Sequence, residues 1–162
     1  MLVDLSRAAL EQDHSVSVAC TKDSVDGYGN YPEHLNALEH MDIPVIFLDS
    51  TFSRDPQKNL QASTTLHSSM TKRCPDLIHS HSSIPSMVSM DALSRLNKKI
   101  PIIQTMHGWG IFKTNEQEQQ DIEILNRVNH IVSISKASEN LLLGKGLSNP
   151  NRSFIYNGLE RT

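Results

Sequence analysis

Residues that could contact a ligand, through a polar side chain or an open backbone, recur in this sequence at or just after the ends of short apolar runs. The residues concerned are His79, His81, His107, Gly108, Ser135 and Lys136. Imidazole donates or accepts hydrogen bonds and changes its charge near neutral pH. Glycine lets a backbone approach a ligand closely. We therefore expect these residues to bind a polar substrate.

Six short apolar runs rich in β-branched residues are the expected strands that would position these residues. They start about 25–35 residues apart, the length of a βαβ unit, and lie at 15–20, 43–48, 77–79, 102–106, 131–134 and 154–156. Several runs are apolar at consecutive positions, as in strands that are covered on both faces. The spacing predicts an α/β fold, a Rossmann-like doubly wound parallel sheet with helices on both faces.

Helical patterns lie between the runs. The first ends near Asp13, and the second begins at Pro32 and ends at His40. The other four are predicted through Ala62, Leu66, Met70 and Cys74, from Ile84 to Lys98-Lys99, from an N-cap at Asn115, and from an N-cap at Ser135 to residues 144–146. Ligands of such folds bind outside the carboxyl ends of the strands, and adjacent strands lie ~4.8 Å apart. We therefore expect His81, His107 and Ser135 to line one rim.

The histidines allow three interpretations. His79 and His81 lie on one face of a strand if the strand extends that far. In the first interpretation both are structural, one packed in the protein and the other exposed. Together with His107 they could instead bind a metal ion. They could also hydrogen-bond a substrate. No Asp or Glu accompanies them at a strand end, so we predict no metal site and no metal-activated water.

Two further segments have a structural and a functional interpretation. After His107 and Gly108, Trp109 would offer an apolar plate to a ligand, or the segment would be a tight turn with a satisfied histidine. Ser135 is predicted to cap a helix, and the N–H groups of that helix end would also suit an anion or a hydroxyl.

Composition limits the class of protein. The 162 residues are enough for one domain, 1–162, and 38% hydrophobic with 20% charged residues is typical of a globular chain. A net charge of −3 does not suggest nucleic-acid binding. No run approaches a membrane span of ~18–20 residues. Asp4 and Arg7 interrupt the first apolar residues, so we expect no signal peptide. Cys20 and Cys74 are expected to be reduced, buried thiols of a cytoplasmic protein.

One expected element is missing from the start of this pattern. A doubly wound domain usually begins with a strand and a Gly-rich turn before its first helix, and that strand lies at the centre of the sheet. Here the first pattern is already helical. We therefore expect either a truncated domain that lacks its first strand or a neighbouring element in its place.

Five segments in order resemble a known family. They are 14–18, 75–82, 101–108, 131–136 and 154–158, preceded by the helical pattern from Leu2 to Gln12. The series resembles the N-terminal, acceptor-side domain of family-4-like GT-B glycosyltransferases over nearly the whole chain. The sequence departs from that pattern at Asp13, where relatives usually have Gly. We also expect the C-terminal donor-binding domain of the family to be absent.

The resemblance implies a retaining transfer of a sugar from a nucleotide-sugar to a saccharide or a lipid-linked acceptor, without a metal ion or another cofactor. By resemblance, His107 reaches the reacting centre as the catalytic residue, and His81 and Ser135 line the acceptor side. We add Gly108 and Lys136 as substrate-binding residues. The nucleotide-sugar would bind to a missing C-terminal domain or a partner chain, so this chain alone should be inactive or weakly active.

Two other functions stay open. The chain could be a non-catalytic Rossmann-like binding or regulatory subunit, or a metal-dependent hydrolase that uses His79, His81 and His107. Peripheral contact with the inner face of a membrane is a further alternative, since lipid-linked acceptors would require it. Its support is a set of basic residues, which could equally complement helix dipoles: Lys72, Arg73, Arg95, Lys98 and Lys99.

Overall fold

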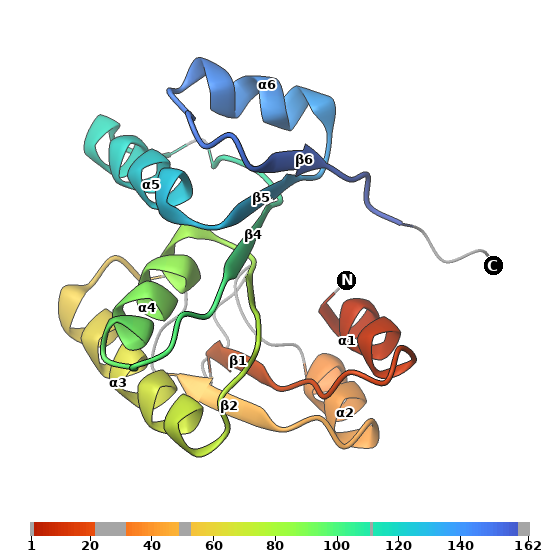
Figure 1. The fold of residues 1–162 in the computed structure, drawn as a ribbon. Helices are drawn as coiled ribbons and strands as arrows, with labels where there is room; N and C mark the ends of the chain where they lie inside the picture. Colours follow the sequence, from red (N-terminus) through yellow and green to blue (C-terminus); the bar gives the residue numbers. More distant parts are fainter. Residues whose placement is uncertain (1, 22–31, 49–52, 111, 159–162) are drawn as a thin grey trace. The chain divides into compact units, whose positions relative to one another are not determined.

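A computed structural model describes residues 2–21, 32–48, 53–110 and 112–158 (Figure 1). Helices and strands alternate along the chain, as the spacing of the apolar runs predicts. In order they are α1 (Leu2–Leu10), β1 (Val18–Thr21), α2 (Pro32–His40), β2 (Val45–Leu48), α3 (Pro56–Lys72), β3 (Ile78–Ser80), α4 (Ser83–Ser94), β4 (Ile102–Met106), α5 (Asn115–Arg127), β5 (His130–Ser133), α6 (Lys136–Gly144) and β6 (Arg152–Phe154).

The chain divides into two compact units, Met1–Lys72 and Arg73–Thr162. In the first unit β1 and β2 pair in parallel, from Val18 opposite Val45 to Thr21 opposite Leu48. Four buried residues form its core, with partly buried side chains of α1 and α2 packed against them: Val18, Cys20, Leu38 and Ile43.

Two aspartates end the first two helices in a left-handed conformation. Asp13 follows α1 with φ 61°, and Asp42 follows α2 with φ 53°. An aspartate tolerates this region better than most residues, but glycine has no Cβ to clash there. Asp13 therefore occupies the kind of position where glycine is usual, as the departure from the family pattern suggests.

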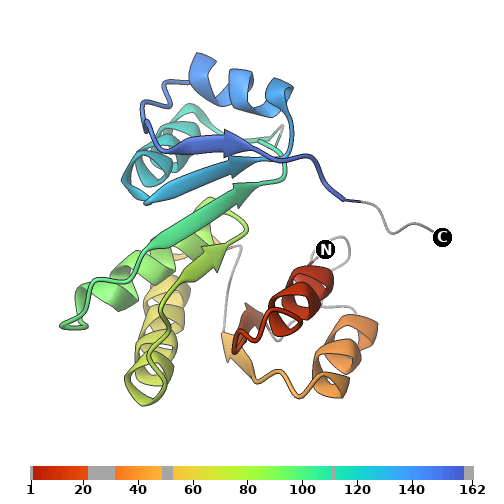
Figure 2. The same ribbon diagram turned by 45° about the vertical axis from the view of Figure 1, so that its right-hand side comes forward.

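The second unit contains a sheet of four parallel strands in the order β3-β4-β5-β6 (Figure 2). Ser80 lies opposite Gln104, Met106 opposite Ser133, and Ser133 in turn opposite Phe154. Consecutive parallel strands bring their carboxyl ends to one edge. Among the described residues no strand pairs with both this sheet and the β1-β2 sheet, and in the common order that is the role of the first strand.

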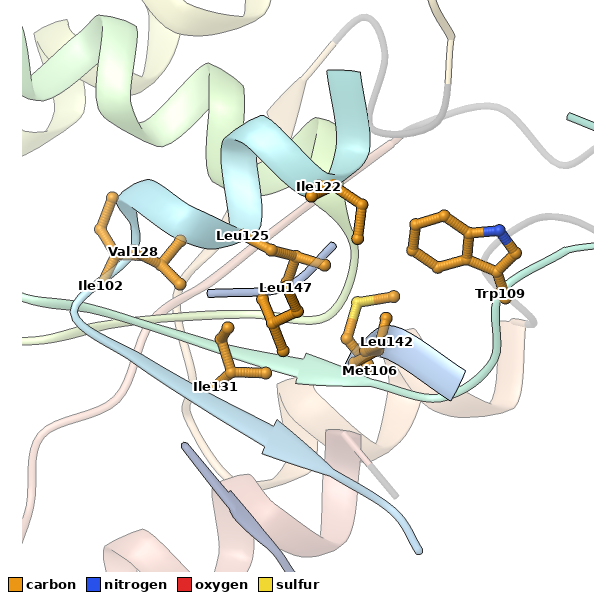
Figure 3. Close-up of a cluster of buried hydrophobic side chains, with 9 residues drawn as sticks. All are labelled: Ile102, Met106, Trp109, Ile122, Leu125, Val128, Ile131, Leu142 and Leu147. Carbon is orange, nitrogen blue, oxygen red and sulfur yellow. The ribbon is translucent and has the colours of Figure 1, made fainter. Parts of the chain in front are cut away.

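One cluster of apolar side chains holds the second unit together (Figure 3). β4 and β5 contribute Ile102, Met106 and Ile131, while α5 and α6 contribute Ile122, Leu125 and Leu142. Leu125 and Ile131 have no exposed surface. Burying side chains of this size stabilises the fold by roughly 1.5–3 kcal/mol each relative to exposure. This packing fixes the strands whose ends carry the histidines.

Several predicted boundaries differ from the structure. α4 ends at Ser94, before Lys98-Lys99, and α5 is capped by Thr114, whose Oγ1 accepts the Gln117 N–H in a capping box. α3 ends at Lys72, so Cys74 lies beyond it and is exposed. The prediction of two buried thiols is thus right only for Cys20. In the described part of the chain, no helix is long and apolar enough to cross a membrane.

Candidate functional site

The carboxyl ends of β3 and β4 bring three imidazole rings together. His81 Nδ1 lies 3.0 Å from His107 Nε2, within hydrogen-bond distance, and His79 Nε2 lies 2.8 Å from Thr105 Oγ1. His81 also stacks between the other two rings, with centroids 4.5 Å from His79 and 5.3 Å from His107. We call His79, His81 and His107 the imidazole cluster. The expected convergence of His81 and His107 on one rim is confirmed.

The register of β3 on β4 explains these contacts. His79 lies opposite Ile103, yet its ring reaches Thr105, two residues further along β4. His81 reaches His107 with the same sequence separation, 26 residues. Side chains two apart on a strand share a face, so one diagonal offset places both pairs on one side of the sheet.

The imidazole cluster is uncharged at neutral pH. Burial first, and then the neighbouring His79 and His107, together lower the pKa of His81 from the ordinary 6.5 to about 4. Burial also lowers the pKa of His79, with a contribution from His107, and burial lowers the pKa of His107. A charged imidazole would lose hydration there and repel its neighbours.

A bond between two neutral imidazoles fixes the roles of the remaining nitrogens. If His81 Nδ1 donates to His107 Nε2, then His81 Nε2 is an acceptor and His107 Nδ1 a donor. If the proton lies on His107 Nε2, both roles reverse. In either state the pair keeps one hydrogen-bond donor and one acceptor for a ligand. A hydroxyl group can bond to either nitrogen, because it both donates and accepts.

The ring arrangement does not favour the metal-site alternative. Stacked rings, with planes inclined by 30° and 16°, direct their in-plane lone pairs along similar planes rather than towards a common point. A tetrahedral site needs ligand atoms that converge at ~2.0–2.1 Å. Among the residues described, no three metal-ligating side chains are grouped to hold an ion.

Gly108 and Trp109 differ in what surrounds them. A Cβ on Gly108 would meet nothing within 4 Å, so packing does not demand glycine there and the space beside the backbone is open. Trp109 is 9% exposed and belongs to the hydrophobic cluster. The prediction that its ring is a plate for a ligand is therefore wrong, because the indole packs against the core.

Ser135 and Lys136 lie where β5 leads into α6. Ser135 caps the helix, as predicted, since its Oγ accepts the Ser138 N–H at 3.1 Å and lies 3.0 Å from Ser138 Oγ. The Lys136 Nζ forms an ion pair with Glu139, and Arg152 lies 3.5 Å from the same carboxylate. We call Lys136, Glu139 and Arg152 the charged cluster.

Sequence reasoning missed three contributors to this edge. The sequence pattern predicts Thr105 only as part of a strand, although its place two residues before His107 puts it on the same face. Glu118 accepts a hydrogen bond from Trp109, and Glu139 pairs with Lys136. The i,i+3 spacing of Lys136 and Glu139 on a helix could have revealed that pair, whereas nothing local links Glu118 to Trp109.

Comparisons with known proteins show the family and the fold of the chain. Residues 1–162 match the family model described as Glycosyltransferase Family 4. Among solved structures, Anabaena HepE in complex with UDP and glucose superposes with a TM-score of 0.67 at 15% identity over 98% of this chain. MurG of Acinetobacter baumannii superposes with a TM-score of 0.63 at 14% identity over 99% of this chain. No significant match is found among curated proteins.

The chain spans 40% of the HepE chain and 41% of the MurG chain. At these identities the superpositions show a shared fold. The predicted fold class, a Rossmann-like α/β domain of the GT-B type, is thereby confirmed.

Proposed function

Because the chain belongs to Glycosyltransferase Family 4, we propose that it is the acceptor-side domain of a retaining, nucleotide-sugar-dependent glycosyltransferase. It would act with a donor-binding domain, on its own chain or a partner, without a metal ion. The observation that carries the proposal is the His81–His107 hydrogen bond at the ends of two adjacent parallel strands. The solved structure of HepE with UDP-glucose supports a nucleotide-sugar as the donor.

The imidazole pair suits a sugar because hydroxyl groups both donate and accept hydrogen bonds. His107 would contact the transferred sugar or the reacting centre through its free Nδ1, while His81 Nε2 binds an acceptor hydroxyl. Since both rings are neutral near pH 7, either tautomer of the pair can meet a hydroxyl without a charged imidazole. Hydrogen bonds of this kind that strengthen in the transition state are what accelerate a transfer.

The other predicted residues have supporting roles in this proposal. The open space at Gly108 leaves room for an acceptor, a saccharide or a lipid-linked one, next to His107. Ser135 keeps its hydroxyl at the helix cap and would meet the acceptor through its remaining hydrogen-bonding capacity. Lys136 would contribute its exposed stem rather than a free charge, because Glu139 already pairs with its amine.

The test is a glycosyl-transfer assay of this chain together with its donor-binding domain. We expect His107→Ala to lower kcat by about 100-fold, within the range for a group acting in the transition state, and to leave nucleotide affinity unchanged. The matched control is His130→Ala, since His130 begins β5 at the opposite end of the strand and bonds Ser153. Normal turnover of the His107 variant would refute the assignment. Acceptor binding without any transfer by the unaltered protein would instead indicate a non-catalytic binding module.

A further inference from the structure

Trp109 is held by a carboxylate nine residues further along the chain. Its ring is 9% exposed and lies at one end of the hydrophobic cluster (Figure 3). A buried indole N–H needs an acceptor. Glu118 of α5 provides one, with Oε1 2.6 Å from the Trp109 Nε1. A bond to a charged acceptor is shorter and stronger than one between neutral groups.

The same carboxylate also binds the residue that caps α6. Lys145 Nζ lies 2.7 Å from Glu118 Oε1 and 2.8 Å from Oε2. The hydrogen bond from Lys145, followed by that from Trp109, lowers the pKa of Glu118 below its ordinary value. Glu118 therefore stays ionised at neutral pH and ties α5, the end of α6 and the segment after β4 to one point.

A second lysine packs over the indole. Lys113 Nζ lies 3.9 Å from the centre of the Trp109 ring and 2.8 Å from Asp121 Oδ2 of α5. This is within the range of a cation–π interaction. Gly110, with φ +78°, turns the chain between the two residues, and a Cβ there would lie 3.4 Å from Lys113 Cε. The turn at Gly110 thus folds Lys113 back towards the ring.

These contacts bear on His107 because only Gly108 separates it from Trp109. On one side His107 continues from β4, where Met106 pairs with Ser133. On the other side Gly108 has no neighbour that a Cβ would touch within 4 Å, so the next anchored residue is Trp109. Because no packing anchors the residue between them, a shift of the indole would reach the His107 backbone across Gly108 alone.

We propose that Glu118 is a positioning residue for His107, acting through Trp109. Glu118 holds the indole and Lys145, and the held indole keeps the His107 ring within hydrogen-bond distance of His81. This inference rests on the proposed function only for the role of His107 in the reaction. The anchoring itself is a property of the chain without substrate.

The anchoring is tested in the full chain with the variants Glu118→Ala and Glu118→Gln, and with Glu123→Gln as the control. Glu123 lies on the same helix, is exposed, and contacts Gln119. Trp109 is the single tryptophan, so acrylamide quenching of fluorescence reports on it alone. We expect the quenching constant to rise about twofold or more in Glu118→Ala as the segment opens locally, less in Glu118→Gln, and not in the control.

The effect on His107 is read from the imidazole NMR signals, with His107 assigned by its loss in His107→Asn. We expect both Glu118 variants to shift the His107 signal and to raise its pKa, because the ring becomes less buried and its bond to His81 loosens. Glu123→Gln should leave both unchanged. If Glu118→Ala fails to fold, Glu118→Gln decides the matter, since it has the same shape and keeps one acceptor oxygen.

Two results would overturn the proposal. Unchanged quenching in the folded Glu118 variants would show that Glu118 does not hold Trp109. Increased quenching with unaltered His107 signals would show that the anchor is structural only. Neither measurement uses a sugar or a nucleotide. A failure of the proposed function would appear in the transfer assay instead, so the two failures are distinguishable.

Discussion

The carboxyl edge of the four-stranded sheet has two clusters of polar side chains, one uncharged and one charged. At the ends of β3 and β4 the imidazole cluster holds three uncharged rings, and in the described part of the chain no ion pair joins a carboxylate to them. At the start of α6 the charged cluster holds two cations on one carboxylate, Glu139, which is 7% exposed.

The two clusters differ in the hydrogen-bonding groups and charges that remain available to a ligand. The imidazole pair keeps one donor and one acceptor for a ligand in either tautomer. In the charged cluster the Glu139 oxygens accept from Lys136 and lie close to Arg152, so both cations already share one counter-charge. The first cluster is therefore suited to recognising neutral hydroxyl groups, and the second to fixing the start of α6.

The largest expected effect is an acid-induced loss of stability from the imidazole cluster. The pKa of His81 is about 4 in the folded chain and about 6.5 in an unfolded one. Between these values the unfolded chain binds more protons, so the contribution is complete above pH 6.5 and is lost as the pH falls towards 4. We expect a loss of up to about 3 kcal/mol in the free energy of unfolding.

Urea unfolding at pH 7 and pH 4.5 measures this loss, with His81→Asn to isolate it. The variant should lose less stability between the two pH values than the unaltered chain. His130→Asn, which removes a histidine bonded to Ser153, should behave like the unaltered chain. The same pH dependence in all three proteins would mean that the imidazole cluster is not the source.

The charged cluster should respond to the loss of its carboxylate. Glu139→Gln leaves Lys136 and Arg152 without a counter-charge at a buried position, and we expect it to cost about 2 kcal/mol of unfolding free energy. Lys136→Ala should cost less than about 1 kcal/mol, because an exposed ion pair contributes little and the Lys136 side chain is 56% exposed. Urea unfolding at pH 7 compares them. Equal costs would contradict the central role of Glu139.

Two serines at helix starts give a finer comparison. Ser135 accepts the Ser138 N–H and caps α6, whereas Ser82 is the N-cap of α4 without a side-chain hydrogen bond to that helix. Ser135→Ala should lower the free energy of unfolding by about 1 kcal/mol, and Ser82→Ala should lower it by only a few tenths of a kcal/mol. Differential scanning calorimetry measures both. A larger loss for Ser82→Ala would mean that the Ser82 hydroxyl, next to His81 in the sequence, stabilises the folded chain.

The smallest expected effect lies within the imidazole cluster itself. His79 stacks on His81 and, after burial, is the next cause of the lowered pKa of that ring, because two protonated rings in contact repel each other. His79→Asn should therefore raise the pKa of His81 without reversing the shift that burial causes. NMR titration of the His81 ring measures this. An unchanged or lower pKa would show that the stacked ring has no electrostatic influence on its neighbour.

The sequence was sufficient for the order of the elements and for the pair at the rim. β-branched runs at βαβ spacing predict parallel strands, and the carboxyl ends of neighbouring strands then bring His81 and His107 together. Pro32 and His40 bound α2 as predicted, and Ser135 caps α6. These features depend on local patterns and on one general rule of topology.

The features that were mispredicted depend on partners far along the chain. Trp109 lies between two glycines, a pattern typical of a surface loop, yet its ring packs in the hydrophobic cluster and its N–H donates to Glu118. Cys74 continues the four-residue spacing of α3, but the helix ends before it. A periodic pattern does not show where tertiary contacts stop supporting a helix.

Gln104 has no exposed surface, and its Oε1 accepts a hydrogen bond from Ser86 at 2.6 Å, which ties α4 to β4. A slip of β4 by a single position would turn this amide to the other side of the sheet and leave the serine hydroxyl without an acceptor. The same slip would displace His107 by about 3.3 Å along the strand. The Gln104 amide thus helps to set the register of β4 against α4, and with it the place of His107 at the end of that strand.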